Sequence, residues 1–263
     1  MKLSLISSEG KSISEAEQSE EVFLAFKNRA YQQGERFRLT LEEDELPDFF
    51  WVQMDEAISP ALIYLTKRFW DYPVIQNESL KRAYSPKVFS GERHYVRVWR
   101  ATAEERHYRN LALNTHDQQQ DTGAYPHAFA NVETRDDATF FARNAIDGML
   151  ANDNHGSFPF QSWGINQQED AQLTINFGRK VLVDKIALVL RADYPHDSFW
   201  TRVTINLDDD TFVLKTSKKS DRQQFAIPPT TTTKVTMKEM IKHQDDSPFP
   251  ALTEIEVYGY EVQ

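Results

Sequence analysis

Hydrophobic and polar residues alternate along much of the first 109 residues. The clearest example is the segment 93–101, in which two valines alternate with Tyr95, Arg97 and Trp99. A period of two predicts a strand that buries one face and exposes the other. Further strand-like segments lie at residues 2–6, 21–28, 31–41, 48–54 and 61–74. Short strands separated by turn residues are typical of a sandwich or barrel, so we predict an N-terminal β-sandwich of unassigned family.

Two segments of this half need a choice between strand and helix. The apolar residues of the segment 21–28 fit either element, and we predict a strand because a turn at Gly34 and an alternating segment follow it. Residues 102–113 predict one helix. Thr102 can cap its N-terminus, and two glutamates follow in the first turn, where the helix dipole favours acidic side chains.

We place a domain boundary after residue 109, which gives an N-terminal domain 1–109 and a C-terminal domain 110–263. The second domain contains a short helical segment that ends near Gly148, and two prolines predict a loop over residues 227–234. Strand candidates lie at residues 171–178, 184–193, 201–207, 211–216, 223–229, 233–240 and 252–262. Strands without intervening long helices predict an antiparallel, all-β arrangement.

The segment 110–178 carries a series of short motifs. They read NLALN, YPHAFANVET, FFARNAIDG, QSWG and LTINFG, and the chain closes on ALTEIEVYG. In this order and spacing they resemble a discoidin-like domain, the fold of coagulation-factor type C domains and of family 32 carbohydrate-binding modules. The resemblance covers residues 110–260 and implies a galactose-binding-like jelly roll. We therefore expect an all-β protein of two β-sandwich domains, the second of them discoidin-like.

Composition supports a packed core and excludes several kinds of site. The chain is 40% hydrophobic, with 17 Phe, 10 Tyr and 5 Trp, which is ample for a folded core. It has no cysteine, so disulfides, thiolate metal sites and a cysteine nucleophile are excluded. The net charge is −10 and neither predicted domain is basic, which argues against nucleic acid and membrane as partners.

The N-terminal residues contain no apolar signal-peptide core, and no segment approaches the length of a membrane span. We therefore expect a cytoplasmic protein, or an extracellular one if a leader was removed. No motif for an organic cofactor occurs, and the seven histidines show no spacing typical of a catalytic zinc site.

The family resemblance implies a structural calcium ion. The matching positions are Asp147, together with neighbouring carbonyls, and Glu254, and Asn152 and Asp153 are nearby oxygen donors. Calcium takes six to eight oxygen ligands, which turn carbonyls and two carboxylates can supply. The alternative is that Asp147 caps a turn and Glu254 is a solvated strand residue.

The segment RADYPHDSFW is the richest candidate for a ligand surface. Sugar sites combine an aromatic platform for the C–H face of the ring with charged or amide groups for the hydroxyls. The predicted ligand-binding residues are Arg191, Asp193, His196, Asp197 and Trp200 of this segment, with His155 and Phe249 from two other loops. The alternative is ordinary structure: Phe199 and Trp200 can face the core, and the aspartates can form turns.

These features predict a non-catalytic carbohydrate-binding protein. The carboxylate pairs Asp193/Asp197 and Glu254/Glu256 fit a glycan-processing enzyme only on spacing, and we expect no catalytic residues. The alternative function is a protein-interaction or self-association module without a sugar ligand. For that function Phe50, Trp70 and Trp99 are candidate interface anchors, while burial within strands is the competing interpretation.

Overall fold

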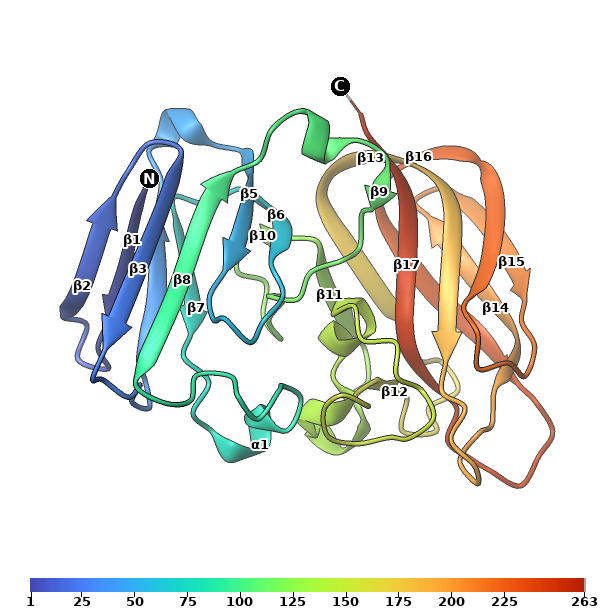
Figure 1. The fold of residues 1–263 in the computed structure, drawn as a ribbon. Helices are drawn as coiled ribbons and strands as arrows, with labels where there is room; N and C mark the ends of the chain where they lie inside the picture. Colours follow the sequence, from blue (N-terminus) through green and yellow to red (C-terminus); the bar gives the residue numbers. More distant parts are fainter. Residues whose placement is uncertain (263) are drawn as a thin grey trace.

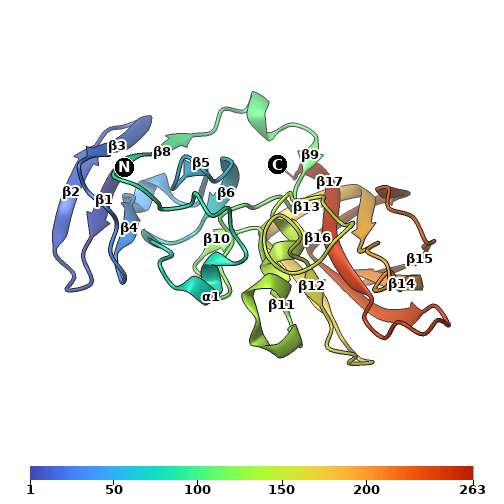
Figure 2. The ribbon, with the colours of Figure 1, turned by 60° about the horizontal axis from the view of Figure 1, so that its bottom comes forward.

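The computed structural model describes residues 1–262, which form two β-sandwiches that lie side by side (Figures 1 and 2). The N-terminal sandwich is the blue-to-cyan part of the ribbon, and the C-terminal sandwich is its yellow-to-red part. The prediction of an all-β protein with two sandwich domains is confirmed. Within the described part of the chain, no helix has the length and apolar character to cross a membrane.

The N-terminal sandwich consists of two antiparallel sheets. One contains, in spatial order, β2 (Ser12–Glu17), β1 (Lys2–Ile6), β4 (Arg36–Thr40) and β7 (Phe69–Pro73). The other contains β10 (Ala124–Tyr125), β6 (Ala61–Leu65), β5 (Asp48–Gln53), β8 (Arg93–Arg100) and β3 (Glu21–Lys27). The strand predicted for the segment 21–28 is therefore confirmed as β3.

Side-chain alternation decides which residues fill this sandwich. Val96 and Val98 of β8 are fully buried between the sheets, whereas Tyr95 of the same strand is 39% exposed. Phe50 and Trp70 also lie in this core, at 0% and 2% exposure. The hypothesis that these two aromatic residues anchor an interface is therefore wrong, because their strands turn them inward.

The C-terminal sandwich is built from one large antiparallel sheet that curls upon itself. Its spatial order is β12 (Trp163–Gly164), β17 (Ala251–Glu261), β13 (Leu173–Leu190), β16 (Gln223–Lys242), β14 (Trp200–Leu207) and β15 (Asp210–Lys215). β11 (His127–Ala130) pairs with β13, and β9 (Arg109–Asn110) pairs with β17. Trp163 is fully buried in the core of this sandwich.

Breaks in register let the long strands β13 and β16 bend. Pro228 and Pro229 lie at one such break, where proline is tolerated because the ladder hydrogen bonds are interrupted. The loop predicted for residues 227–234 is wrong. Thr230 and Thr232 resume pairing with β13 directly after the prolines and are buried, as β-branched residues favour.

Helices are few and short. The elements are α1 (Glu78–Lys81) and the 3₁₀ helices η1 (Glu43–Glu45), η2 (Glu104–Arg106), η3 (Thr134–Asp136), η4 (Ala138–Phe140) and η5 (Ala142–Ile146). The predicted helical segment before Gly148 is confirmed by η4 and η5. The longer helix predicted for residues 102–113 is wrong. Thr102 and Glu105 do form reciprocal capping bonds, but pairing of β9 with β17 stops the helix after one turn.

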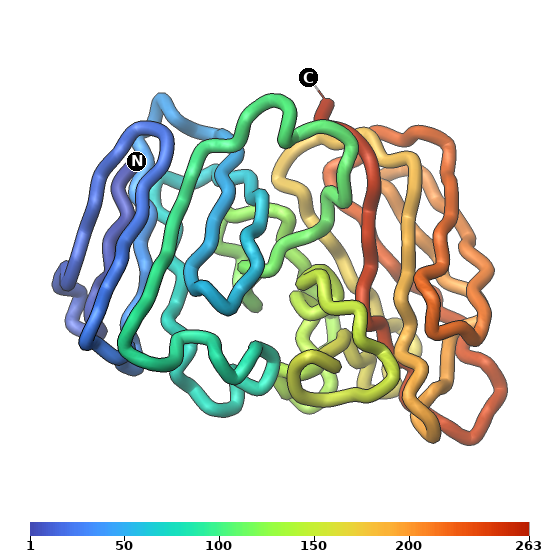
Figure 3. Tube along the Cα trace, in the orientation of Figure 1, coloured from blue at the N-terminus to red at the C-terminus, as the bar shows by residue number. Residues whose placement is uncertain are grey.

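The segment around the predicted domain boundary contributes to both sandwiches. β9 joins the C-terminal sheet, and the chain then returns to place β10 beside β6 in the N-terminal sheet. Figure 3 shows this green segment passing between the two bodies. The N-terminal sheet is therefore completed by residues that follow the predicted boundary.

The C-terminal strand also connects the two sandwiches. Glu261 in β17 accepts hydrogen bonds from Arg179 Nε, at 2.6 Å, and from Arg109. The guanidinium of Arg179 lies 4.6 Å from the ring centre of Phe49 and 4.9 Å from that of Tyr64, both in the N-terminal sandwich. Burial opposes ionisation of Glu261, but the two arginines outweigh it and lower the pKa of its carboxyl.

Candidate functional site

A cavity of about 510 Å³ opens at the end of the C-terminal sandwich where β13 ends and β17 begins. Its walls come from the loop between β13 and β14, the loop between β16 and β17, the segment that follows η5, the residues 164–167 at and after β12, and the 3₁₀ helices η3 and η4. The loop before β17 projects at the lower right of Figure 1. The volume is typical of a site for a small ligand. Four of the predicted ligand-binding residues line it, namely His155, Arg191, His196 and Phe249.

Arg191 supplies the fixed charge of this cavity. Its backbone N–H donates to the carbonyl of Ala251 at 3.1 Å, which ties it to the start of β17. The side chain is buried, and its Nη2 donates to the carbonyl of Phe249. Its Nε lies 3.0 Å from Oδ1 of Asp193, an ion pair without hydrogen-bond geometry. Burial lowers the pKa of Arg191, and Asp193 opposes that change. The guanidinium stays charged. Its contacts with Phe249 and Asp193 hold it in one orientation.

Asp193 connects Arg191 to a second loop. Its Oδ2 accepts a hydrogen bond from Nδ1 of His155 at 2.5 Å, and its side chain is only 7% exposed. The backbone N–H of His196 donates to the carbonyl of Asp193 at 2.6 Å, which closes the turn that presents His196. Asp193 therefore orients Arg191 and His155 through its carboxylate and His196 through its backbone carbonyl.

Aromatic rings lie next to this charged group. The ring of His196 is centred 5.0 Å from that of His155 and 6.2 Å from that of Phe249. Phe249 is 43% exposed, and the neighbouring Tyr194 is 88% exposed. The cavity thus combines an oriented cation with apolar ring faces that a ligand can reach.

Asn152 has a structural task in this region. Its amide nitrogen donates to the carbonyls of Leu190, at 2.7 Å, and Ser220, at 2.9 Å. The carbonyl of Asn152 in turn accepts from the backbone of Ala192 at 2.8 Å. These bonds fasten the loop after η5 to the end of β13. The side chain of Asn152 therefore stabilises the loops around the cavity through hydrogen bonds to the backbone.

Two predicted ligand residues lie apart from the cavity. Trp200 begins β14 and is 1% exposed in the core of the C-terminal sandwich, because the strand turns its ring inward. Asp197 forms an ion pair with Lys218, with 2.7 Å between Oδ2 and Nζ. We therefore leave Trp200 and Asp197 out of the proposed site.

The opposite wall of the cavity contains residues that sequence reasoning did not identify. Arg135 and Phe140 come from η3 and η4 and line the same space. The guanidinium of Arg135 lies 6.0 Å from the ring centre of Phe140. No local signal marks these residues in the sequence, because their place beside Arg191 depends on how η3 and η4 pack against the sandwich.

The two residues implied as calcium ligands are both buried. Asp147 follows η5 at 5% exposure, and Glu254 lies in β17 at 1%. Oδ1 of Asp147 accepts from the N–H of Met149, at 2.9 Å, and both oxygens of Glu254 accept from the N–H of Gly148, at 3.2 Å. Asp147 does cap a turn, but the alternative of a solvated Glu254 is wrong because β17 turns this side chain inward.

The electrostatics of this pair fit a divalent cation. Burial raises the pKa of Asp147 to about 6, and burial together with Asp147 raises that of Glu254 well above its usual value. A bound cation would offset the cost of ionising two neighbouring buried carboxyls. Ca²⁺ suits this place because it prefers carboxylate and carbonyl oxygens. Asp147 and Glu254 would hold such an ion. It would fasten the turn after η5 to β17 and perform no chemistry.

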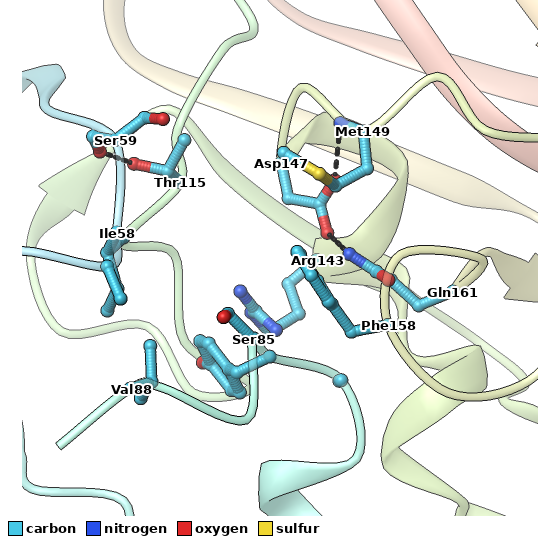
Figure 4. A pocket seen from close by; sticks show the side chains of 13 residues that line it. Ile58, Ser59, Ser85, Val88, Thr115, Arg143, Asp147, Met149, Phe158 and Gln161 are labelled. Carbon is cyan, nitrogen blue, oxygen red and sulfur yellow. Dashed lines mark hydrogen bonds between the residues drawn. The ribbon is translucent and has the colours of Figure 1, made fainter. Parts of the chain in front are cut away.

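A smaller cavity of about 180 Å³ lies between the two sandwiches (Figure 4). Gln161 donates to Oδ2 of Asp147 at 2.7 Å on one side, and Thr115 donates to the carbonyl of Ser59 at 2.5 Å on the other. The buried Arg143 lies between them and donates through Nε to the carbonyl of Asp117 at 2.8 Å. These contacts belong to the packing of the two sandwiches against each other.

Comparison of the sequence with known families and proteins gives no assignment. No protein-family model matches the chain. No curated protein matches it either.

Comparison of the fold finds solved structures similar to half or more of the chain. A family 32 carbohydrate-binding module from C. perfringens NanJ, solved with galactose, is 20% identical over 50% of this chain and 91% of its own, with a TM-score of 0.38. A chitosan-binding module from Paenibacillus sp. IK-5 is 20% identical over 57% and 99%, with a TM-score of 0.41. A fucose-binding module from Streptococcus pneumoniae is 17% identical over 58% and 99%, with a TM-score of 0.40. Family 32 modules, to which the sequence motifs point, are thus among these structures.

Proposed function

We propose that this chain is a non-catalytic carbohydrate-binding protein and that the sugar lies in the cavity beside Arg191, His196 and Phe249. The observation that carries the proposal is the buried guanidinium of Arg191, held by Asp193 and by the carbonyl of Phe249. An oriented charged donor is suited to ring hydroxyls, which need hydrogen-bond partners in fixed directions.

The apolar part of a sugar would meet the aromatic side of the cavity. Pyranose rings have a C–H face that packs on an aromatic ring, and Phe249 is 43% exposed at this place. His196 stands between Phe249 and His155 and offers a ring nitrogen to a hydroxyl. The cavity therefore offers both kinds of contact that a hexose requires.

Glycan-array screening followed by calorimetry tests this proposal. We expect a neutral or acidic hexose to bind at 1:1 stoichiometry, and Phe249→Ala and His196→Ala each to weaken it by roughly tenfold. Phe129→Ala is the matched control, because Phe129 is 46% exposed in the same sandwich but lies on β11. Absence of binding across neutral and acidic sugars, or equal affinity of the Phe249 and Phe129 variants, would contradict the proposal.

A second candidate function is association with another copy of the chain. The outer face of the sheet that contains β3 and β8 carries Phe23, 53% exposed, with its ring 5.9 Å from that of Tyr95. Nearby, Trp99 stacks on Trp51 at 5.8 Å and lies under the guanidinium of Arg97. Aromatic residues and arginine are enriched at interfaces. A light-scattering mass near 61 kDa (about twice the 30.6 kDa chain) that falls to 30.6 kDa in Phe23→Ser would support it.

A further inference from the structure

Three residues with metal-binding side chains gather at one end of the N-terminal sandwich. Asp55 and Glu56 follow the end of β5, and His94 lies at the start of β8. β5 and β3 end at the lower edge of this sandwich in Figure 1, and β8 begins there. Each of the three residues offers a ligand atom, and these atoms all lie within 4.8 Å of one another.

His94 is held with one ring nitrogen free. It is 4% exposed, and its Nε2 lies 3.0 Å from the carbonyl oxygen of Arg29. Because a carbonyl can only accept, Nε2 carries a proton, and Nδ1 is the ring nitrogen left for another partner. Nδ1 is buried and has no hydrogen-bond partner among the described residues. A histidine oriented by a backbone carbonyl through its other nitrogen is the usual arrangement of a metal ligand.

The carboxylate of Asp55 is buried and fixed in the same place. Its Oδ1 accepts from the N–H of Ala57 at 2.8 Å, and its Oδ2 accepts from the N–H of Phe89 at 2.9 Å. Asp55 is 1% exposed, and it forms no ion pair with Lys or Arg among the described residues. Each oxygen keeps a further lone pair, so these two bonds orient the carboxylate without saturating it.

Glu56 completes the group from the solvent side. Its side chain is exposed, and its Oε2 accepts a long hydrogen bond of 3.3 Å from the N–H of Tyr95. An exposed glutamate can change rotamer at little cost, so it can move the short distance needed to meet the two buried ligand atoms. This side is also the route by which an ion would enter.

Tyr31 covers the group from another loop. Its ring is centred 4.0 Å from that of His94, and its hydroxyl is buried without a partner in the described part of the chain. A phenol O–H is a hydrogen-bond donor, so Tyr31 can donate to a carboxylate of this group.

We propose that Asp55, Glu56 and Nδ1 of His94 bind a first-row divalent transition metal ion such as Zn²⁺. One imidazole with two carboxylates suits these metals, whereas Ca²⁺ and Mg²⁺ prefer oxygen alone. The ion would replace the missing positive charge beside Asp55 and give His94 Nδ1 its partner. It would also fasten the loop after β5 to β8, next to the cavity between the sandwiches that Ile58 and Val88 line.

Metal titration of the untagged, chelator-treated full chain tests this site. We expect one Zn²⁺ per chain by calorimetry in the wild type, and at least a tenfold weaker affinity in Glu56→Gln. Glu92→Gln is the matched control, since Glu92 is exposed just before β8 and lies outside the group. A further control, His155→Ala with His196→Ala, removes the other histidine pair and should leave this binding unchanged.

Cobalt substitution identifies the ligands independently. Co²⁺ bound at this site should give visible d–d absorption, and the ring NMR signals of His94 should shift with one equivalent of Zn²⁺. Loss of the Co²⁺ absorption in His94→Gln, with a retained far-UV spectrum, would support the assignment. Absence of stoichiometric Zn²⁺ binding, or affinity unchanged by Glu56→Gln, would overturn it.

Discussion

Nδ1 of His155 and Oδ2 of Asp193 meet at 2.5 Å across two loops that are 38 residues apart in sequence. The same carboxylate pairs with Arg191 through its other oxygen. Asp193 is thus the residue that converts separate loops into one cavity wall. The proposed sugar site depends on this carboxylate even if no ligand touches it.

Removal of Asp193 should destabilise the protein as well as the site. In Asp193→Ala the guanidinium of Arg191 loses its only carboxylate partner among the described residues, and leaving a buried charge unpaired costs roughly 3 kcal/mol. Calorimetric melting should show a lowered Tm. Asp153→Ala removes an exposed carboxylate from the adjacent loop and should leave the Tm unchanged. Equal Tm values for the two variants would contradict this role.

The carboxyl of Asp147 should make stability depend on pH when no calcium is present. Its pKa is about 6 in the folded protein against an ordinary 3.8, so the folded state binds its proton more tightly. Stability from this group is complete below pH 3.8 and is lost as pH rises through 6, a change of about 3 kcal/mol.

Urea unfolding in EGTA between pH 4.5 and 7.5 measures this dependence. The comparison of wild type with Asp147→Asn removes this titration together with its effect on the pKa of Glu254, whereas groups away from this pair titrate alike in both proteins. The wild type should lose stability relative to the variant as pH rises. Parallel curves would show that Asp147 titrates normally.

Calcium should reverse that loss if Asp147 and Glu254 hold the ion. At a calcium concentration one hundred times its Kd, binding to the native state alone adds about 2.7 kcal/mol to the free energy of unfolding. We expect a higher Tm in Ca²⁺ than in EGTA at pH 7.5. Glu254→Gln should abolish the difference, whereas the exposed control Glu169→Gln should retain it. Identical Tm values for the wild type in both buffers would argue against a structural ion.

The link between the sandwiches should depend on Glu261. In Glu261→Gln the charge that holds Arg179 and Arg109 is lost, so Arg179 is released from its position over Phe49. We expect the calorimetric unfolding of the wild type to be one transition and that of the variant to separate into two. Glu239→Gln serves as an exposed control in the same sandwich. A single transition in both variants would show that other contacts couple the domains.

Gly259 in the closing strand should not tolerate a side chain. A Cβ at this position would lie 1.9 Å from the carbonyl oxygen of Leu182 in the paired strand β13. Gly259→Ala would force the two backbones apart and cost about 3 kcal/mol. Gly156→Ala is a control with open space around the glycine, although its positive φ adds a smaller strain. A Tm drop no larger than that of the control would refute the close approach.

The site was only partly visible in the sequence. Arg191, His196 and Phe249 could be recognised as candidates from residue type. Charged and aromatic residues are clustered there in segments predicted as loops, between strands of mostly apolar residues. Trp200 could not be separated from them, since its burial is decided by the direction in which β14 starts. Arg135 enters the cavity through packing of η3, which no local pattern encodes.

By itself the sequence determined the all-β class and most of the strands, because alternation with a period of two is a local property of backbone geometry. The exceptions are the segments 102–113 and 227–234, where pairing with distant strands overrides the local pattern. Only the tertiary structure decided which side chains meet across sequence. It buried Glu254 beside Asp147, completed the N-terminal sheet with β10, and brought Asp55 and Glu56 to His94. These contacts between residues distant in sequence depend on the strand order and on the side of the sheet to which each side chain points. Both are set by the packing of the whole core.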